Sequence, residues 1–292
     1  MRSYLFKDKK DISRLRELIT SLGAASTMVD FEEKVQMPSI LEALRLYEED
    51  GRLVGFAFVD NYNNLYFDTL PDFDRLEQLE SGCIAWGVCC LQAQNARTGS
   101  RDTLDSSCSA GNERRVRVLE QHGFIRTQVR SLHYSRPLDD TLPDYPLPAG
   151  FLIRPVNGRD EVEALVELHR QAFASDHMTV EERLAIMNSP EYIPELDLVV
   201  VSPEDLLAAF CICGYSDPDK KVGYTDPIGT HPRFQRLGLA RAVVTAGMQR
   251  LKNAGAQVVE LGMSSENSGM QKLAEELGFS CISEKLWFSR QV

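Results

Sequence analysis

The chain has 292 residues, 43% of them hydrophobic and 26% charged, which are the proportions of a folded globular protein. Because this length exceeds what one hydrophobic core usually holds, we expect two domains. The 32 basic and 43 acidic residues give a net charge of −11, which argues against nucleic acid as a partner. The same charge favours an amine-bearing substrate and also serves solubility.

Cysteine usage and the N-terminal segment indicate the compartment. The seven cysteines include no C-x-x-C pair and lie mostly in apolar runs, so we expect buried thiols in a reducing environment. The N-terminus is charged from Lys7 onward, and no window approaches the roughly 20 apolar residues that a membrane span needs. We expect a cytoplasmic protein with no membrane partner, and no set of metal ligands stands out.

The first half of the chain combines strand and helix patterns. Its apolar, cysteine-rich segment at 83 to 91 is expected to be core rather than a thiol site. The predicted elements, in chain order, are strands at 51–60 and 64–70, a helix at 76–93, a short helix from Asn112 to Gly123-Phe124, and a strand at 131–136.

The second half repeats the same pattern of strands, helices and turn residues, with an offset near 154 residues. In both halves an Asn opens a short helix 11 residues before a Gly-Phe pair, at Asn112 and at Asn267. One duplicated fold is the simplest explanation. Residues 136 to 150 hold four prolines and three aspartates and therefore read as a linker. We predict domains at 1–137 and 151–292, joined by a linker at 138–150.

Elements of the second half follow the order β-α-α-β-β-β-α-β-α-β-β, which predicts an α/β fold of the α+β kind, a mixed and mostly antiparallel sheet flanked by helices. The predicted elements are a strand at 151–156, helices at 160–175 and after Thr179, strands within 196–214 and at 222–231, a helix to about 253, a strand at 256–263, a helix from Asn267 to Leu277, and two short closing strands.

The stretch HPRFQRLGLARAVV, at 231 to 244, joins a strand to a helix through a glycine turn. Free backbone N–H groups at such a helix start can hold a pyrophosphate. Gly238 and Ala240 would let the phosphate approach, and Arg236 and Arg241 would add charge. An ordinary tight turn with solvent-facing arginines is the alternative.

This stretch resembles the Q/R-x-x-G-x-G/A signature of the GNAT acyltransferases, in the six residues Gln235, Arg236, Leu237, Gly238, Leu239 and Ala240. The segment at 266–279 is similar to the last helix of that family, and the likeness covers residues 150 to 292. The first half resembles the fold only. The whole chain therefore resembles tandem GNAT proteins, with the two-domain arrangement of the mycothiol synthase family.

The resemblance implies acetyl-CoA as co-substrate. Backbone groups of Ile228, Gly229 and Thr230 would contact the pantetheine arm and the thioester, and the amides from Arg236 to Arg241 would hold the pyrophosphate. Pro227 has no backbone N–H to donate to a neighbouring strand, so it fits a place where two strands of the sheet separate. Asn267 would meet the pantetheine arm, or it simply caps its helix, as Asn112 would in the first half.

Transfer to an amine needs a base, and Asp226 is the one carboxylate on the predicted strand. With period two, Tyr224, Asp226, Ile228 and Thr230 share one face, although a bulge would break this parity. Asp226 could instead bind local backbone, as turn aspartates do. A lone histidine before proline, His231, is read as a surface turn residue.

The family's usual acid is a tyrosine in the last helix, where this chain has Ala274. Tyr224, Ser268 or water would then protonate the thiolate. In the first half the corresponding turn holds Pro71, Asp72 and Asp74, and these acids would repel pyrophosphate. That domain is therefore expected to have lost the cofactor and to shape the acceptor pocket or support its twin.

The expected activity is direct acetyl transfer from acetyl-CoA to a primary amine in the C-terminal domain. A non-catalytic acyl-CoA-binding protein and an acyltransferase with a longer donor are the alternatives. A small-molecule amine, an aminoglycoside-like polyamine and a peptide N-terminus all stay open as acceptors, and so does the oligomeric state.

Overall fold

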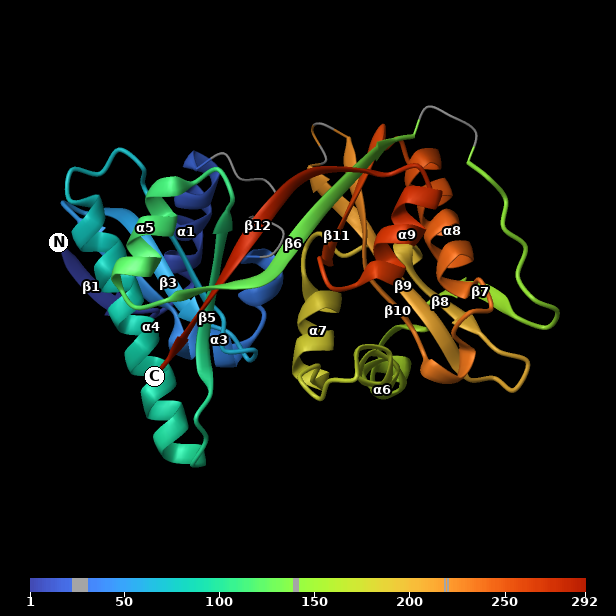
Figure 1. Cartoon of the computed structure of the whole chain (residues 1–292), viewed down its shortest axis with the longest axis horizontal. Coiled ribbons are helices and arrows are strands. Elements are labelled where there is room, and N and C mark those ends of the chain that lie inside the picture. Colours follow the sequence, from blue (N-terminus) through green and yellow to red (C-terminus); the bar gives the residue numbers. More distant parts are fainter. Residues whose placement is uncertain (23–30, 139–141, 218, 220) are drawn as a thin grey trace. The chain divides into compact units, whose positions relative to one another are not determined.

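A computed structural model gives the fold of residues 1–22, 31–138, 142–217, 219 and 221–292 (Figure 1). The chain forms two compact units. The first contains Met1–Ser131 and Ser283–Val292, and the second contains Leu132–Ile282. Two long strands, β6 (Ile125–Pro137) and β12 (Ser280–Gln291), contribute residues to both units.

The first unit is built on an antiparallel sheet in the order β1-β2-β3-β4. Strand β3 is buried after its first residue, because helices α1 and α4 pack against it. Strand β5 pairs antiparallel with the C-terminal part of β12. The elements are β1 (Arg2–Leu5), α1 (Lys9–Ser21), α3 (Pro38–Ala43), β2 (Arg45–Glu49), β3 (Arg52–Val59), β4 (Leu65–Thr69), α4 (Leu76–Thr98), β5 (Thr103–Ser109) and α5 (Glu113–Gln121).

The second unit contains a mixed sheet in which β11, β10, β9, β8 and β7 are neighbours in that order. Strands β10 and β11 are parallel and the other pairs are antiparallel. The elements are β7 (Leu152–Pro155), α6 (Val162–Phe173), α7 (Val180–Asn188), β8 (Asp197–Val201), β9 (Leu207–Asp217), β10 (Val222–Thr230), α8 (Leu239–Asn253), β11 (Val258–Ser264) and α9 (Ser268–Glu276).

Two hydrophobic cores lie on the two faces of this sheet. We call them the α8 core and the α6 core after the helices that supply side chains to them. The α8 core includes Cys211, Cys213, Val243, Val244, Met248, Leu251, Val259, Leu261, Met263 and Ala274. The α6 core includes Val156, Leu165, Leu168, Val199, Val201, Phe210 and Ile212. Alternate residues of β9 point into each core, which is why this strand is an almost continuous apolar run.

The predicted element order and the mixed sheet are confirmed, with one correction. The two short strands predicted at the end of the chain are one strand, β12, because no turn residue interrupts the alternation between Ser280 and Gln291. The predicted domain boundaries stay a prediction, since the compact units divide within β6 and β12, and residues 139–141 of the predicted linker lie outside the described residues.

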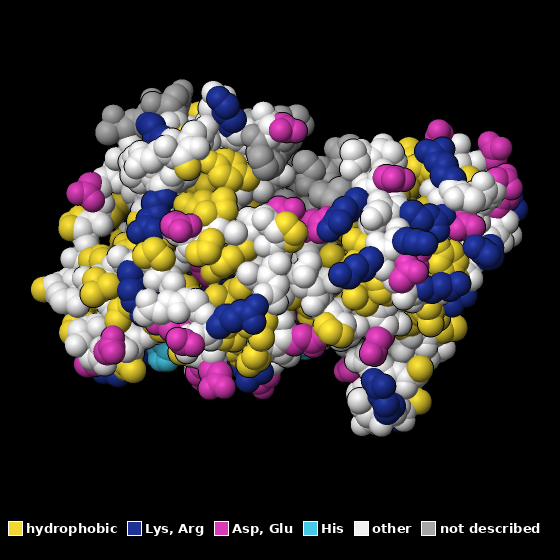
Figure 2. All heavy atoms as spheres, turned by 180° about the vertical axis from the view of Figure 1, so that it is seen from behind, with side chains coloured by type: hydrophobic (Ala, Val, Ile, Leu, Met, Phe, Trp, Pro, Cys, Tyr) yellow, Lys and Arg dark blue, Asp and Glu magenta, His cyan; other side chains and the backbone are white. Residues whose placement is uncertain are grey.

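Charges on the surface are mixed. In Figure 2, Lys and Arg side chains are interspersed with Asp and Glu side chains. Among the residues that the structure describes, no helix is both long and apolar enough to pass through a membrane.

Candidate functional site

The segment between β10 and α8 is a tight turn ordered by its own polar groups. The imidazole Nδ1 of His231 accepts from the amide of Arg233 at 3.1 Å, so His231 has the predicted role of a turn residue. Farther along, the Gln235 side chain donates to the carbonyl of Thr230 at 3.4 Å. Arg236 then adopts a φ of +63°, which directs the chain into the start of the helix.

Helix α8 begins after a glycine, which has no side chain to cap the helix. Gly238 is the N-cap with a φ of +79°, and it provides no side-chain cap for the amides of the first turn. A Cβ built on Gly238 would meet nothing within 4 Å, so the space beside this glycine is open. The start of this 15-residue helix therefore offers free N–H donors at the positive end of its dipole, with room for an anion.

The two arginines of this turn differ in their surroundings. The Arg241 guanidinium forms an ion pair with Glu276 of α9 and lies 4.9 Å from the ring centroid of Tyr145. Its charge is thus largely neutralised within the fold. Arg236 is exposed and lies beside the open helix end. Of the predicted pair, Arg236 is therefore the better placed to contact an anion.

Strands β10 and β11 separate beside this turn. Their register runs from Val222–Val258 to Tyr224–Glu260 and goes no farther. Beyond that point a side chain bridges the two strands, because the Asp226 carboxylate (Oδ2) accepts from the amide of Gly262 at 2.9 Å. Pro227 lies in this gap, as the sequence predicts.

The predicted shared face of β10 is interrupted by a bulge. Register with β9 shifts between Thr225 and Ile228, so that one extra residue lies on β10. As a result Tyr224 packs against the α6 core, whereas Ile228 packs against the α8 core. The parity prediction is wrong for Ile228 and for Thr230, which pairs with Ala209 of the α8 core, for this reason.

Tyr224 and Asp226 stay on one face, together with Glu260 of β11. Val259 and Leu261 point into the α8 core, so Glu260 and Gly262 face the other way. A Cβ on Gly262 would be 3.1 Å from the Asp226 oxygen, which places the carboxylate on that same face. The Tyr224 hydroxyl would be 2.6 Å from a Cβ on Gly214 of β9, so it lies over β9 and not over the gap.

The last residues of β10 pack against α6 and pair with β9, and their other edge is not paired with β11. Ile228, Gly229 and Thr230 pair with β9 on one side. A Cβ on Gly229 would be 2.3 Å from Phe210 and 2.9 Å from Ala172, so only glycine lets α6 approach here. The other edge of this segment faces the gap toward β11.

Asn267 acts as a helix cap. Its side chain accepts from the amide of Met270 at 3.0 Å, just as Asn112 accepts from Arg115 at 3.0 Å in the first unit. This is the capping alternative of the sequence analysis. Ala274, at the position of the family's acid, is completely buried in the α8 core and offers no proton.

Two polar residues on the face shared by Tyr224, Asp226 and Glu260 were not predicted. The imidazole Nε2 of His133 on β6 lies 3.3 Å from Glu260 Oε2, and the Ser216 hydroxyl of β9 donates to the same oxygen at 3.4 Å. The run VVELGM does show one acid in an otherwise apolar strand, and that was the available signal for Glu260. His133 could not be found this way, because it lies more than a hundred residues earlier.

In the first unit the corresponding gap lies between β4 and β5, and a side chain of the same unit fills it. Strand β4 meets β5 only near Asn64, in a parallel bridge to Asp105. Farther along β4, the Arg115 guanidinium donates to the Phe67 carbonyl at 3.1 Å and lies 4.0 Å from the centroid of the Phe67 ring. The same guanidinium lies 2.9 Å from Glu80, which is fully buried.

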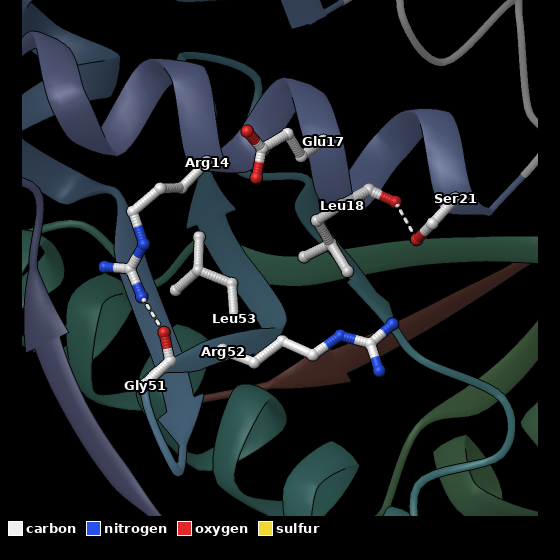
Figure 3. Close-up of a pocket in the computed structure, with 7 residues that line it drawn as sticks. All are labelled: Arg14, Glu17, Leu18, Ser21, Gly51, Arg52 and Leu53. Atoms are coloured by element: carbon white, nitrogen blue, oxygen red, sulfur yellow. Dashed lines mark hydrogen bonds between the residues drawn. The ribbon is translucent and has the colours of Figure 1, made fainter.

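The first unit also contains a cavity of about 310 Å³ beside α1. Figure 3 shows Arg14 of α1 bonded there to the carbonyl of Gly51, with Leu53 beside this bond and the Arg52 side chain extending away from Gly51, across from α1. None of the predicted site residues lines this cavity. The predicted turn with Pro71, Asp72 and Asp74 lies between β4 and α4, as expected.

Comparison with known proteins agrees with this geometry. The profile of the Acetyltransferase (GNAT) family matches residues 162–279, which include the gap, the glycine turn and α9. The chain carries a GNAT acetyltransferase domain. Enzymes of this family take the acetyl group from acetyl-CoA, and the expected GNAT-type, acyl-CoA-dependent N-acyltransferase is confirmed at that level.

Relatives extend the likeness beyond the GNAT domain. A mycothiol acetyltransferase of Nocardiopsis dassonvillei is 28% identical over 275 residues, covering 83% of this chain and 80% of that protein. One from Thermobispora bispora is 30% identical over 168 residues, covering 54% of this chain and 56% of its own length.

Solved structures show the same fold. A GCN5-related N-acetyltransferase from Sphaerobacter thermophilus has a TM-score of 0.67 at 21% identity, covering 85% of this chain and 80% of its own. A tandem GNAT protein from the clavulanic acid biosynthesis pathway has a TM-score of 0.68 at 15% identity, covering 99% and 97%. The expected likeness to tandem GNAT proteins is thus confirmed at the level of the fold.

Proposed function

We propose that the chain transfers an acetyl group from acetyl-CoA directly to a primary amine of a small molecule, with the active site in the second unit. The observation that carries this proposal is the open, uncapped start of α8 at Gly238, beside the gap between β10 and β11. An anion site next to a gap between strands suits a long cofactor whose diphosphate lies at the helix and whose thioester lies between the strands.

Binding of the donor would use mainly backbone groups. The free amides from Leu239 to Arg241 would hold the diphosphate, with Arg236 beside it. The pantetheine arm would lie along the open edge of Ile228 to Thr230. Asn267 would take no part beyond capping α9, because its side-chain oxygen already accepts from an amide.

Chemistry would take place on the face that carries Asp226. The amine nitrogen forms a bond to the thioester carbonyl carbon, the carbon–sulfur bond breaks, and the proton lost by the amine goes to Asp226 directly or through water. The Gly262 amide orients that carboxylate. Because the Tyr224 hydroxyl lies over β9, we assign protonation of the thiolate to water and not to this tyrosine.

Arg115 supports the choice of the second unit. Its guanidinium lies on the β4 edge that corresponds to the open edge of β10, and buried Glu80 holds it there. A pantetheine arm could not enter without displacing this ion pair. Asp72 and Asp74 would also repel a diphosphate at the turn of the first unit.

Steady-state release of CoA from acetyl-CoA with a panel of small amines tests the proposal, with Asp226→Asn as the comparison. Turnover that is lost in the variant while acetyl-CoA still binds would support it. Tight binding with no turnover for any amine would instead favour a non-catalytic acyl-CoA-binding protein, which buried Ala274 favours. A series of donors of increasing chain length decides between acetyl and longer acyl groups.

A further inference from the structure

A second carboxylate lies on the catalytic face that we propose. Glu260 is the parallel-register partner of Tyr224 and precedes Gly262 by two residues, so its side chain faces the same way as the Asp226 carboxylate. Two residues of a strand span on the order of 6 to 7 Å. The two carboxylates are therefore neighbours along one face.

Contacts with other strands hold Glu260 in place. His133 on β6 and Ser216 on β9 both reach the same oxygen, Oε2, at 3.3 and 3.4 Å. The Glu260 side chain keeps 21% of its exposure, so a solute can reach it. These contacts leave Oε1 as the oxygen to meet a ligand.

The two carboxylates have different partners and therefore suit different roles. Asp226 is bonded to a backbone amide beside the gap and is placed to take a proton there. Glu260 lies farther from the gap, where the strands are still paired, and cannot reach the thioester region in the same way. A carboxylate at this distance suits recognition of a second positive group on the acceptor.

We propose that Glu260 determines acceptor specificity by binding a second ammonium group, so that the acceptors are diamines or polyamines. This inference rests on the proposed function. One nitrogen would approach Asp226 and be acetylated, while another contacts Glu260. His133 and Ser216 are positioning residues, because they act through the Glu260 carboxylate. The net charge of −11 would attract such substrates.

Two amines of equal length test this idea in the full chain: putrescine, and n-pentylamine, in which a methyl group replaces the second ammonium. We expect the wild type to favour putrescine by about tenfold in kcat/KM, mainly through KM, which corresponds to one charge-assisted contact. Glu260→Gln should reduce this preference to within about threefold while leaving the kcat for n-pentylamine and the acetyl-CoA affinity unchanged.

Control variants separate recognition from general effects. Glu120→Gln removes one negative charge from an exposed position of α5 and should keep the full preference. His133→Gln, which loosens Glu260 without removing its charge, should give an intermediate preference. Equal use of the two amines by the wild type, or an unchanged preference in Glu260→Gln, would overturn the inference while the proposed function stands. Absence of turnover with every amine would overturn both.

Discussion

The amide of Gly262 donates to the Asp226 carboxylate at 2.9 Å, two residues beyond the last register pair of β10 and β11. A side chain thus takes the place that a backbone carbonyl would have if the strands stayed paired. The bond satisfies a donor that would otherwise be left open at the gap. In the mechanism that we propose, the same aspartate would also act as the base.

Asp226→Asn should separate these two roles. Asparagine keeps an oxygen that accepts from Gly262, so the free energy of unfolding and the acetyl-CoA affinity should change little. Loss of the base should lower kcat/KM for the amine by about 100-fold to 10,000-fold. Steady-state kinetics and chemical denaturation check both parts, and a variant with wild-type kcat/KM would remove Asp226 from the mechanism.

Gly238→Ala tests the start of α8, and Gly255→Ala beyond the other end of the same helix is its matched control. Both glycines have positive φ, +79° and +99°, and an added Cβ would meet nothing within 4 Å at either. Each variant should lose a similar stability of about 1 kcal/mol. Only Gly238→Ala should weaken CoA binding, by tenfold or more in titration calorimetry, because its Cβ would enter the space of the diphosphate. Equal CoA affinities would show that the diphosphate lies elsewhere.

Arg115→Met tests the filled gap of the first unit. Glu80 is fully buried and pairs with both Arg114 and Arg115, so the variant leaves this carboxylate with one of its two arginine partners. We expect the free energy of unfolding to fall by about 1 to 3 kcal/mol, because one charged hydrogen-bonding partner of Glu80 and the donor to the Phe67 carbonyl are lost. Arg117→Met, at an exposed position where the guanidinium lies 3.7 Å from the Glu113 carboxylate, should change it little. Similar losses in both variants would contradict a structural role for the buried pair.

The free energy of unfolding should depend on pH through His169. Burial, together with the nearby Arg183 charge, lowers the pKa of His169 from 6.5 to about 4. Its ring lies against Phe173 and Phe210, with centroids 4.5 and 5.6 Å away. The folded state thus resists protonation, and stability that is complete above pH 6.5 should be lost as the pH falls toward 4, by up to roughly 3 kcal/mol.

His169→Met removes this titration and places an apolar side chain of similar volume between the two phenylalanine rings. Urea denaturation at pH 7 and at pH 4.5 should show a smaller loss in the variant than in the wild type. The same loss in both would mean that other groups cause the acid sensitivity.

Local signals in the sequence predicted much of this molecule. Apolar periodicity gave the element order, the matching Asn caps and Gly-Phe pairs revealed the duplication, and Gly238 indicated the turn before α8. Each of these signals comes from residues close together in the chain. The physical interactions behind them, caps and backbone conformations, are equally local.

Long-range packing accounts for what the sequence did not predict. The bulge at Asp226 and Pro227 moved Ile228 to the other face, because it depends on how β9 pairs with β10. Glu260 meets His133 only after β6 reaches the second unit, and Arg115 fills its gap only once α5 packs beside β4. Such contacts depend on tertiary structure and leave no periodic pattern in the chain.

A crystal structure of the full chain soaked with CoA tests the central claim most directly. We predict that the diphosphate oxygens lie about 3 Å from the amides of Leu239, Ala240 and Arg241. We also predict that one CoA binds per chain, with the first unit closed by Arg115. A diphosphate located elsewhere, or a second CoA in the first unit, would contradict this account.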